Sequence, residues 1–286
     1  MRETSMTTGR RSLSVGLRAF VAPTTLVLLA VLGAGCSEEE MVQPARPLQA
    51  TASLLELNDG TGPYALAQII VVSTESGTPE FVENTTTATV TYGEAEVDLA
   101  DQRVRLRGEP GAQVETTFHR ATSRQNNQLA YVRGETYTFT FSVASGGFAS
   151  ETHQMTITTP DIDDTVERVS DPTPNEKLDI VTSERFEAGI VQVVRAGSSQ
   201  TTWTSYPFDE NSLTSAAEVI ERRTDLEQLK GGIVTVPAEA FKRSGTHEVT
   251  FIGVHVDDSP AAISAGLGDQ SVIFAGSAST LTVNIP

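Results

Sequence analysis

Short segments in which apolar and polar residues alternate run through this chain and restrict it to β-structure. The clearest is Thr136–Val143, where four large apolar residues alternate with threonine and serine: Tyr137, Phe139, Phe141 and Val143. A period of two places the apolar groups on one face of a strand and the hydroxyls on the other. Similar segments occur at 67–73, 85–92, 97–107 and 153–158, with the turn sequence Ser145-Gly-Gly147 between two of them. We therefore predict that the first half is all-β.

The second half follows the same plan and adds a helical insertion. Its strand-like segments are 178–181, 189–195, 201–206, 233–236, 248–256 and 279–285. Ser215 to Glu218 has the pattern of a capping box, which predicts a helix that ends at Gly231 and Gly232. Within 248–256 the apolar phase shifts after Phe251, which predicts a β-bulge near Gly253.

Prolines and aspartates divide the chain into segments. They cluster between Pro160 and Lys177 and predict a linker there, whereas the polar, proline-containing segment 36–48 is typical of an extended tether. The strand pattern on either side of the linker resembles immunoglobulin-like and fibronectin-like domains, without the cysteine and tryptophan marks of antibody domains. This resemblance implies an all-β fold of two tandem immunoglobulin-like β-sandwiches, the second with a short helical insertion. The expected segments are a signal peptide (1–35), the tether (36–48), domain 1 (49–160), the linker (161–176) and domain 2 (177–286).

The amino-terminal segment has the composition of an export signal. Arg2, Arg10, Arg11 and Arg18 give it a basic lead, residues 19–32 carry no charge, and small residues follow at 33–35. This order of charge, apolar core and small residues is typical of a secretory signal peptide. An uncleaved anchor helix is the alternative, although the apolar core is shorter than the ~20 residues that a membrane span needs.

The only cysteine of the chain follows these small residues directly. Leu32-Gly-Ala-Gly-Cys36 resembles the bacterial lipobox, with its leucine one position further from the cysteine than is usual. The resemblance implies that Cys36 receives a diacylglyceryl group, becomes the new amino terminus and anchors the protein in a membrane. Ser37, in place of an aspartate, favours the outer membrane by analogy with Gram-negative lipoproteins. With Cys36 lipidated, no thiol remains for a disulfide, so packing alone must stabilise the fold.

The charge of the chain excludes one class of partner. The formal net charge is −17, and the chain becomes more acidic when residues 1–35 are removed. A chain without a basic stripe is not expected to bind nucleic acid. Only three lysines follow the signal, Lys177, Lys230 and Lys242, which is typical either of a saline habitat or of a GC-rich genome.

The sequence contains few residues in patterns that indicate catalysis. There is no G-x-S-x-G elbow and no phosphate-binding G-x-x-x-x-G-K loop. The four histidines are His119, His153, His247 and His255. His247 and His255 have the same strand parity, so they could lie on one face and serve as zinc ligands or as a general base. The simpler interpretation is that they are surface or edge histidines.

Two sets of residues are candidates for ligand binding. The first consists of carboxylates that could supply the hard oxygen ligands of calcium: Asp161, Asp163, Asp164, Asp257 and Asp258. In so acidic a chain, adjacent aspartates also arise from composition alone. The second set is aromatic, Trp203, Tyr206 and Phe208, which would offer a platform for a sugar or a protein partner. The alternative is that Trp203 fills the second core.

These observations favour a non-enzymatic binding or structural module that is anchored in the cell envelope and holds a partner protein or a glycan. No cofactor is expected apart from the possible calcium. The alternative is an envelope hydrolase or metal-dependent enzyme whose site is assembled from dispersed acidic residues and histidines. A concave pocket where such residues converge would favour the enzyme, and flat loops with exposed aromatic side chains would favour the binding module.

Overall fold

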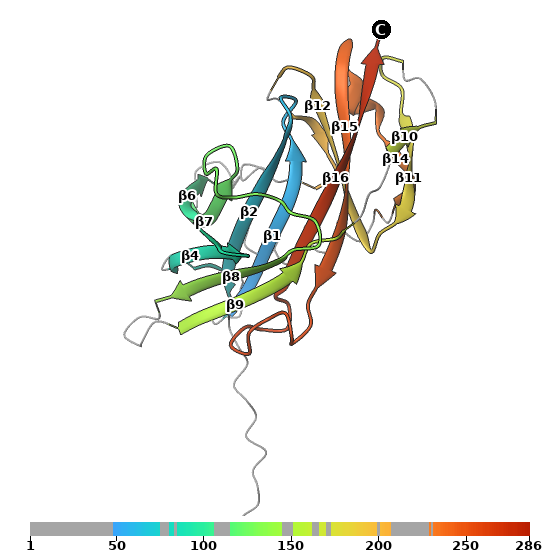
Figure 1. Cartoon of the computed structure of the whole chain (residues 1–286). Helices are drawn as coiled ribbons and strands as arrows, with labels where there is room; N and C mark the ends of the chain where they lie inside the picture. Colours follow the sequence, from blue (N-terminus) through green and yellow to red (C-terminus); the bar gives the residue numbers. More distant parts are fainter. Residues whose placement is uncertain are drawn as a thin grey trace, which may run out of the picture. The chain divides into compact units, whose positions relative to one another are not determined.

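One long sheet contains strands from both halves of the chain in the computed structural model (Figure 1). The structure describes residues 48–74, 80–82, 85–105, 115–144, 151–161, 166–169, 173–198, 201–206, 229 and 231–286. Within these ranges the strand order of the long sheet is β13-β12-β15-β16-β1-β2-β7-β6, and the short β3 pairs with β2. The strands are β1 (Leu48–Asn58), β2 (Pro63–Ser73), β3 (Glu80–Phe81), β6 (Ala100–Arg105), β7 (Glu115–Thr122), β12 (Ala188–Arg195), β13 (Thr201–Thr204), β15 (Gly245–Asp257) and β16 (Val272–Ile285).

Two smaller antiparallel sheets complete the described strands. The four-stranded sheet has the order β5-β4-β8-β9, and the three-stranded sheet has the order β10-β11-β14. Their strands are β4 (Thr85–Tyr92), β5 (Ala95–Asp98), β8 (Thr136–Val143), β9 (Glu151–Thr158), β10 (Val166–Arg168), β11 (Leu178–Arg185) and β14 (Gly231–Val236). A short 3-10 turn, η2 (Ala238–Phe241), follows β14. The all-β fold predicted from the sequence is thus confirmed, while most of the predicted helix before Gly231 lies outside the described residues.

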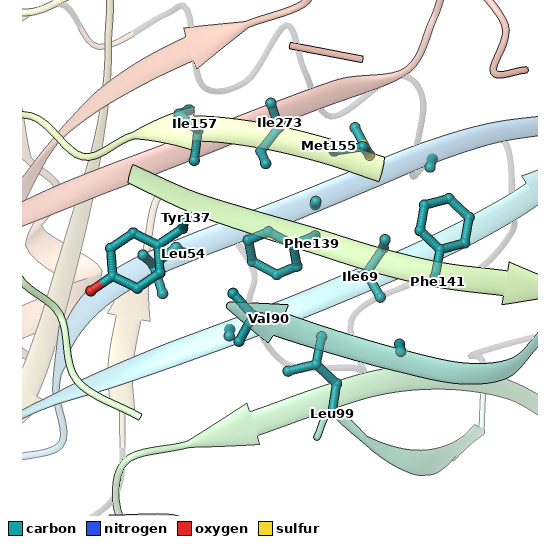
Figure 2. Packing of buried hydrophobic residues seen from close by; sticks show 14 of the residues in the cluster. Leu54, Ile69, Val90, Leu99, Tyr137, Phe139, Phe141, Met155, Ile157 and Ile273 are labelled. Carbon is teal, nitrogen blue, oxygen red and sulfur yellow. The ribbon is translucent and has the colours of Figure 1, made fainter. Parts of the chain in front are cut away.

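The first core lies between the long sheet and the four-stranded sheet. The alternation predicted for β8 is exact, because Tyr137, Phe139, Phe141 and Val143 are buried and the residues between them are not. Figure 2 shows these aromatic side chains packed with Leu54 of β1 and other residues of the cluster. The two layers therefore exclude water from one face of each sheet, which is the main stabilising effect in a sandwich.

The second core uses the other end of the long sheet. Val193 of β12 and Phe251 of β15 pack there with Val234 and Val236 of the three-stranded sheet. Along β16, Ile273 belongs to the first core and Val283 to the second, and their equal parity places both cores on one face of the long sheet. A third buried cluster covers the opposite face of the sheet: Leu55, Leu57, Leu66, Ala188, Ile190, Ile252, Val254 and Phe274.

Burial on both faces explains the apolar phase of β15, and the predicted bulge near Gly253 is wrong. The pairing of β15 with β16 runs without a register shift from Gly245 opposite Ile285 to Asp257 opposite Ile273. Phe251 faces the second core, whereas Ile252 belongs to the cluster on the opposite face. A continuous apolar run is typical of a strand buried on both faces. Gly253 is needed for a different reason, because a β-carbon there would lie 2.3 Å from the ring of Phe186.

The two halves are joined by a parallel pair of strands. β1 pairs with β16 from Thr51 opposite Val272 to Leu55 opposite Gly276. The described residues accordingly belong to one compact unit. One sheet therefore continues through both predicted domain ranges, and the tandem immunoglobulin-like arrangement stays a prediction. The boundaries of those ranges stay a prediction.

This shared sheet predicts that damage to the first core will destabilise the second. Leu54→Ala removes a fully buried side chain of the first core, and we expect a loss of about 2–5 kcal/mol in the free energy of unfolding. Trp203, the only tryptophan, packs against the second core, so its fluorescence reports on that core during urea unfolding. The midpoint measured by Trp203 fluorescence should fall in Leu54→Ala.

A matched control is Ile233→Ala, because Ile233 is 75% exposed on the three-stranded sheet. Its effect should be within about 0.5 kcal/mol. The prediction would be wrong if Leu54→Ala left the midpoint measured by Trp203 fluorescence unchanged while circular dichroism showed a separate transition at lower urea. That result would mean that the two halves unfold independently.

Candidate functional site

A shallow pocket of about 190 Å³ opens at the end of the second core, between β12, β13, β15 and the η2 turn. Three of the side chains that line it are cationic, namely Arg195, Lys242 and Arg243. One carboxylate, Glu239, also lines the pocket. A concave site that collects positive charge in a chain of net charge −17 is the clearest candidate functional site in the described part of the protein.

Strand register brings two of the pocket residues together. Arg195, the last residue of β12, lies directly opposite His247 near the start of β15. Both have the parity of Val193 and Val249, so all four side chains are on the face of the sheet that bears the second core. Directly opposed residues of an antiparallel pair have β-carbons about 4.5–5.5 Å apart. Val193 and Val249 are buried in the second core, and the next pair on this face, Arg195 and His247, lines the pocket.

His247 is held rigidly at this position. Its side chain has no exposed surface, and its ring meets the ring of Phe241 edge-on at a centroid distance of 5.7 Å. Nδ1 lies 3.1 Å from the carbonyl oxygen of Gly245. A carbonyl only accepts, so Nδ1 carries the proton and donates it to this hydrogen bond. Nε2 is buried and has no hydrogen-bond partner among the described residues.

Gly245 shapes the contact between the arginine and this histidine. Its φ of 122° lies in a region that favours glycine over any other residue. A β-carbon at Gly245 would lie 3.6 Å from Nη2 of Arg195, so the guanidinium group lies over this glycine. Gly245 therefore fixes the His247 ring through its own carbonyl group. The guanidinium group of Arg195 packs on the side of Gly245 where other residues carry a β-carbon.

An irregularity in β13 supplies the remaining edge of the pocket. Val193 pairs with Trp203 and Val194 pairs with Thr201, which leaves Thr202 as an extra residue between the two pairs. The hydroxyl of Thr202 donates to the carbonyl of Val193 at 3.1 Å. The extra residue bends the strand, and both Thr201 and Thr202 line the pocket.

The cations of the pocket differ from other cations in their pairing. Elsewhere Arg124 pairs with Asp59 at 3.2 Å, and Arg133 lies 3.7 Å from Glu56. Within the ranges that the structure describes, Arg195, Lys242 and Arg243 form no ion pair with a carboxylate. Their positive charge is therefore available to a ligand.

The histidines singled out from the sequence do not form a common site. His247 and His255 share a face of β15, but they stand near opposite ends of that strand. His255 lies 3.2 Å from Glu187, and the buried His119 lies 2.7 Å from Asp101. In the described part of the chain, no three histidine, cysteine, aspartate or glutamate residues are grouped to hold a metal ion.

The predicted calcium ligands are only partly described. Asp161 is exposed just after β9, and Asp163 and Asp164 lie outside the described residues. Asp257 ends β15 and accepts a hydrogen bond from the backbone N–H of Ser259 at 2.9 Å, while Asp258 is exposed. Calcium binding stays a prediction.

The aromatic residues pack on two different faces. Trp203 contacts the second core, whereas Tyr206 meets Phe274 edge-on in the cluster on the opposite face of the long sheet, at a centroid distance of 6.0 Å. Phe208 lies outside the described residues. Trp203 and Tyr206 therefore do not form one platform, and a ligand-binding role for these residues stays a prediction.

Sequence reasoning singled out His247 but missed the cations around it. Lys242 and Arg243 are adjacent basic residues in an acidic chain, and that local contrast was a usable signal. Arg195 gave no such signal, because its place in the pocket depends on the pairing of β12 with β15.

The signal segment and Cys36 lie outside the described residues. The helices of the described part include none that is both long enough and apolar enough to cross a membrane.

No known protein family and no curated protein matches the sequence. Among solved structures, red sea bream transglutaminase is similar over 83% of this chain and 31% of its own, with 10% identity and a TM-score of 0.20. The identity and the TM-score are too low for this similarity to inform either fold or function.

The buried histidines outside the pocket predict how stability depends on pH. Burial lowers the pKa of His153, and the nearby Glu151 offsets this only in part. Burial likewise lowers the pKa of His119, against the opposing effect of Asp101. Below about pH 6.5, the ordinary histidine pKa, the unfolded chain therefore binds protons that the folded protein does not. Urea unfolding should show stability that is complete above this pH and decreases as the pH falls towards 5.

Replacement of one such histidine should reduce this dependence. We expect His153→Gln to lose less free energy of unfolding between pH 7.5 and pH 5.5 than the unmodified protein, with His119 accounting for the remainder. His255→Gln, at a half-exposed position, is the matched control. If the free energy of unfolding of His153→Gln depends on pH as strongly as that of the unmodified protein, His153 is not a source of the pH dependence.

Proposed function

We propose that the protein is a lipid-anchored, non-enzymatic binding or structural module of the cell envelope, built from two immunoglobulin-like sandwich units. The observation that carries this proposal is the order of segments at the amino terminus. An apolar stretch and three small residues precede Cys36, and a polar spacer then leads to β1 at Leu48. Acyl chains on Cys36 would hold the protein at a membrane, because each buried methylene contributes about 0.8 kcal/mol.

The pocket supports a binding role for the β-structure. It gathers cationic side chains from β12 and from the segment after η2, and none of them forms an ion pair with a described carboxylate. Ala240 of the second core lines the pocket, and His247 packs edge-on against the Phe241 ring, so the ligand meets a preformed surface. We propose that this pocket contacts the envelope partner, either a protein or a glycan.

Substitution of the cysteine tests the anchor. Cys36→Ala removes the sulfur that forms the thioether, so incorporation of labelled fatty acid should fall to background and the protein should leave the membrane fraction. The matched control is Ser37→Ala, which alters the adjacent residue but keeps the sulfur and should retain the label. Absence of label from the unmodified protein, or its persistence in Cys36→Ala, would refute the anchor.

A further inference from the structure

We infer that the pocket beside His247 is an oxyanion site that takes one carboxylate or phosphate group of the ligand. This inference rests on the proposed binding function of the same pocket and names the chemistry that the pocket recognises. It is carried by the charge and the hydrogen-bond donors of the lining and by the size of the pocket.

The charge of the lining favours an anion. Arg195, Lys242 and Arg243 contribute three positive charges, and Glu239 contributes one negative charge. Clustered like charges repel one another and raise the free energy of the empty site, so an anion that binds there relieves this repulsion as well as forming new contacts. Charge-assisted hydrogen bonds from guanidinium and ammonium groups to carboxylate or phosphate are among the strongest in proteins.

The lining also offers hydrogen-bond donors from two elements. The guanidinium group of Arg195 on β12 lies over Gly245, and Lys242 and Arg243 after η2 line the same pocket. Charged donors from two elements match an oxyanion, which has several lone pairs to satisfy. A neutral or cationic ligand would leave most of these donors without an acceptor.

His247 adds a buried nitrogen that needs a partner. Nδ1 is already bound to the carbonyl of Gly245, so Nε2 is the ring nitrogen that has no partner among the described residues. A buried nitrogen without a hydrogen bond is unfavourable, and natural proteins contain few of them. With the proton on Nδ1, Nε2 can only accept, so it would serve a hydroxyl of the ligand beside the anion, such as a protonated phosphate oxygen or a sugar hydroxyl.

The size of the pocket limits the ligand to one such group. Sites for drug-sized ligands have volumes of about 300–1,000 Å³. At about 190 Å³, this pocket is smaller and admits a single charged group or one small ring. The rest of the ligand would remain outside the pocket.

Calorimetric titration of the purified lipidated protein in neutral detergent tests this inference. The probes are inorganic phosphate, glucuronate and, as the neutral comparison, glucose. We expect at least one of the two anions to bind, glucose not to bind, and the affinity to weaken as sodium chloride is added. Preference for phosphate or for glucuronate would distinguish the two sources of the oxyanion, and either preference supports the site.

Single substitutions locate the binding. Arg195→Gln should weaken anion binding by about tenfold, equivalent to about 1.4 kcal/mol, and Lys242→Gln should weaken it in the same direction. Because both side chains are exposed, these variants should keep the thermal stability of the unmodified protein. The matched control is Arg133→Gln, which removes the same charge from an arginine that lies beside Glu56, outside the pocket. This control should bind anions normally.

Three results would overturn the inference: neither anion binds, glucose binds as well as the anions, or Arg133→Gln loses as much affinity as Arg195→Gln. Fatty-acid labelling of Cys36 does not involve the pocket. Failure of the anchor and failure of the oxyanion site are therefore separate observations.

Discussion

The parallel pairing of β1 with β16 is the constraint on which the rest of the structure depends. Each of these strands has a second neighbour, β2 or β15, so the pair occupies the middle of the long sheet. The backbone groups of this pair are buried and must find hydrogen-bond partners within the sheet. Separation of β1 from β16 would leave these groups unpaired at two new sheet edges, which is unfavourable. One continuous sheet then supplies a shared face to both cores and leaves the opposite face to the third cluster.

The position of the pocket follows from this arrangement. β12 and β15 are long strands in the same sheet, and the second core covers them only as far as Val193 and Val249. Arg195 and His247 come next in the register, and the chain after β14 turns through η2 to place Phe241 against the histidine. Residues that lie just beyond a rigid core have a fixed backbone, while their surroundings are open to solvent. This is the usual setting of a binding site on a β-scaffold.

Local pattern predicted the strands well and their partners poorly. The bounds predicted for β4 and β8 are those observed, because each strand buries one face and shows the period of two. β15 is buried on both faces, so its sequence shows no clean alternation and the phase shift resembled a bulge. The pairing of β1 with β16 joins segments near opposite ends of the described chain, and no local pattern encodes such a contact. For the same reason His247 was visible in the sequence as a candidate, whereas its neighbour Arg195 was not.

The acidity of the chain and the basic pocket together restrict the ligand further. At physiological ionic strength, charges separated by more than about 8 Å of solvent are largely screened, so the three cations act on a group that enters the pocket. A long polyanion would extend beyond this range over the surface of a chain of net charge −17, where like-charge repulsion opposes binding. A ligand with one isolated anionic group gains the contacts in the pocket without this penalty. For the proposed oxyanion site, this contrast would favour a single anionic group on an otherwise weakly charged partner over a polyanion.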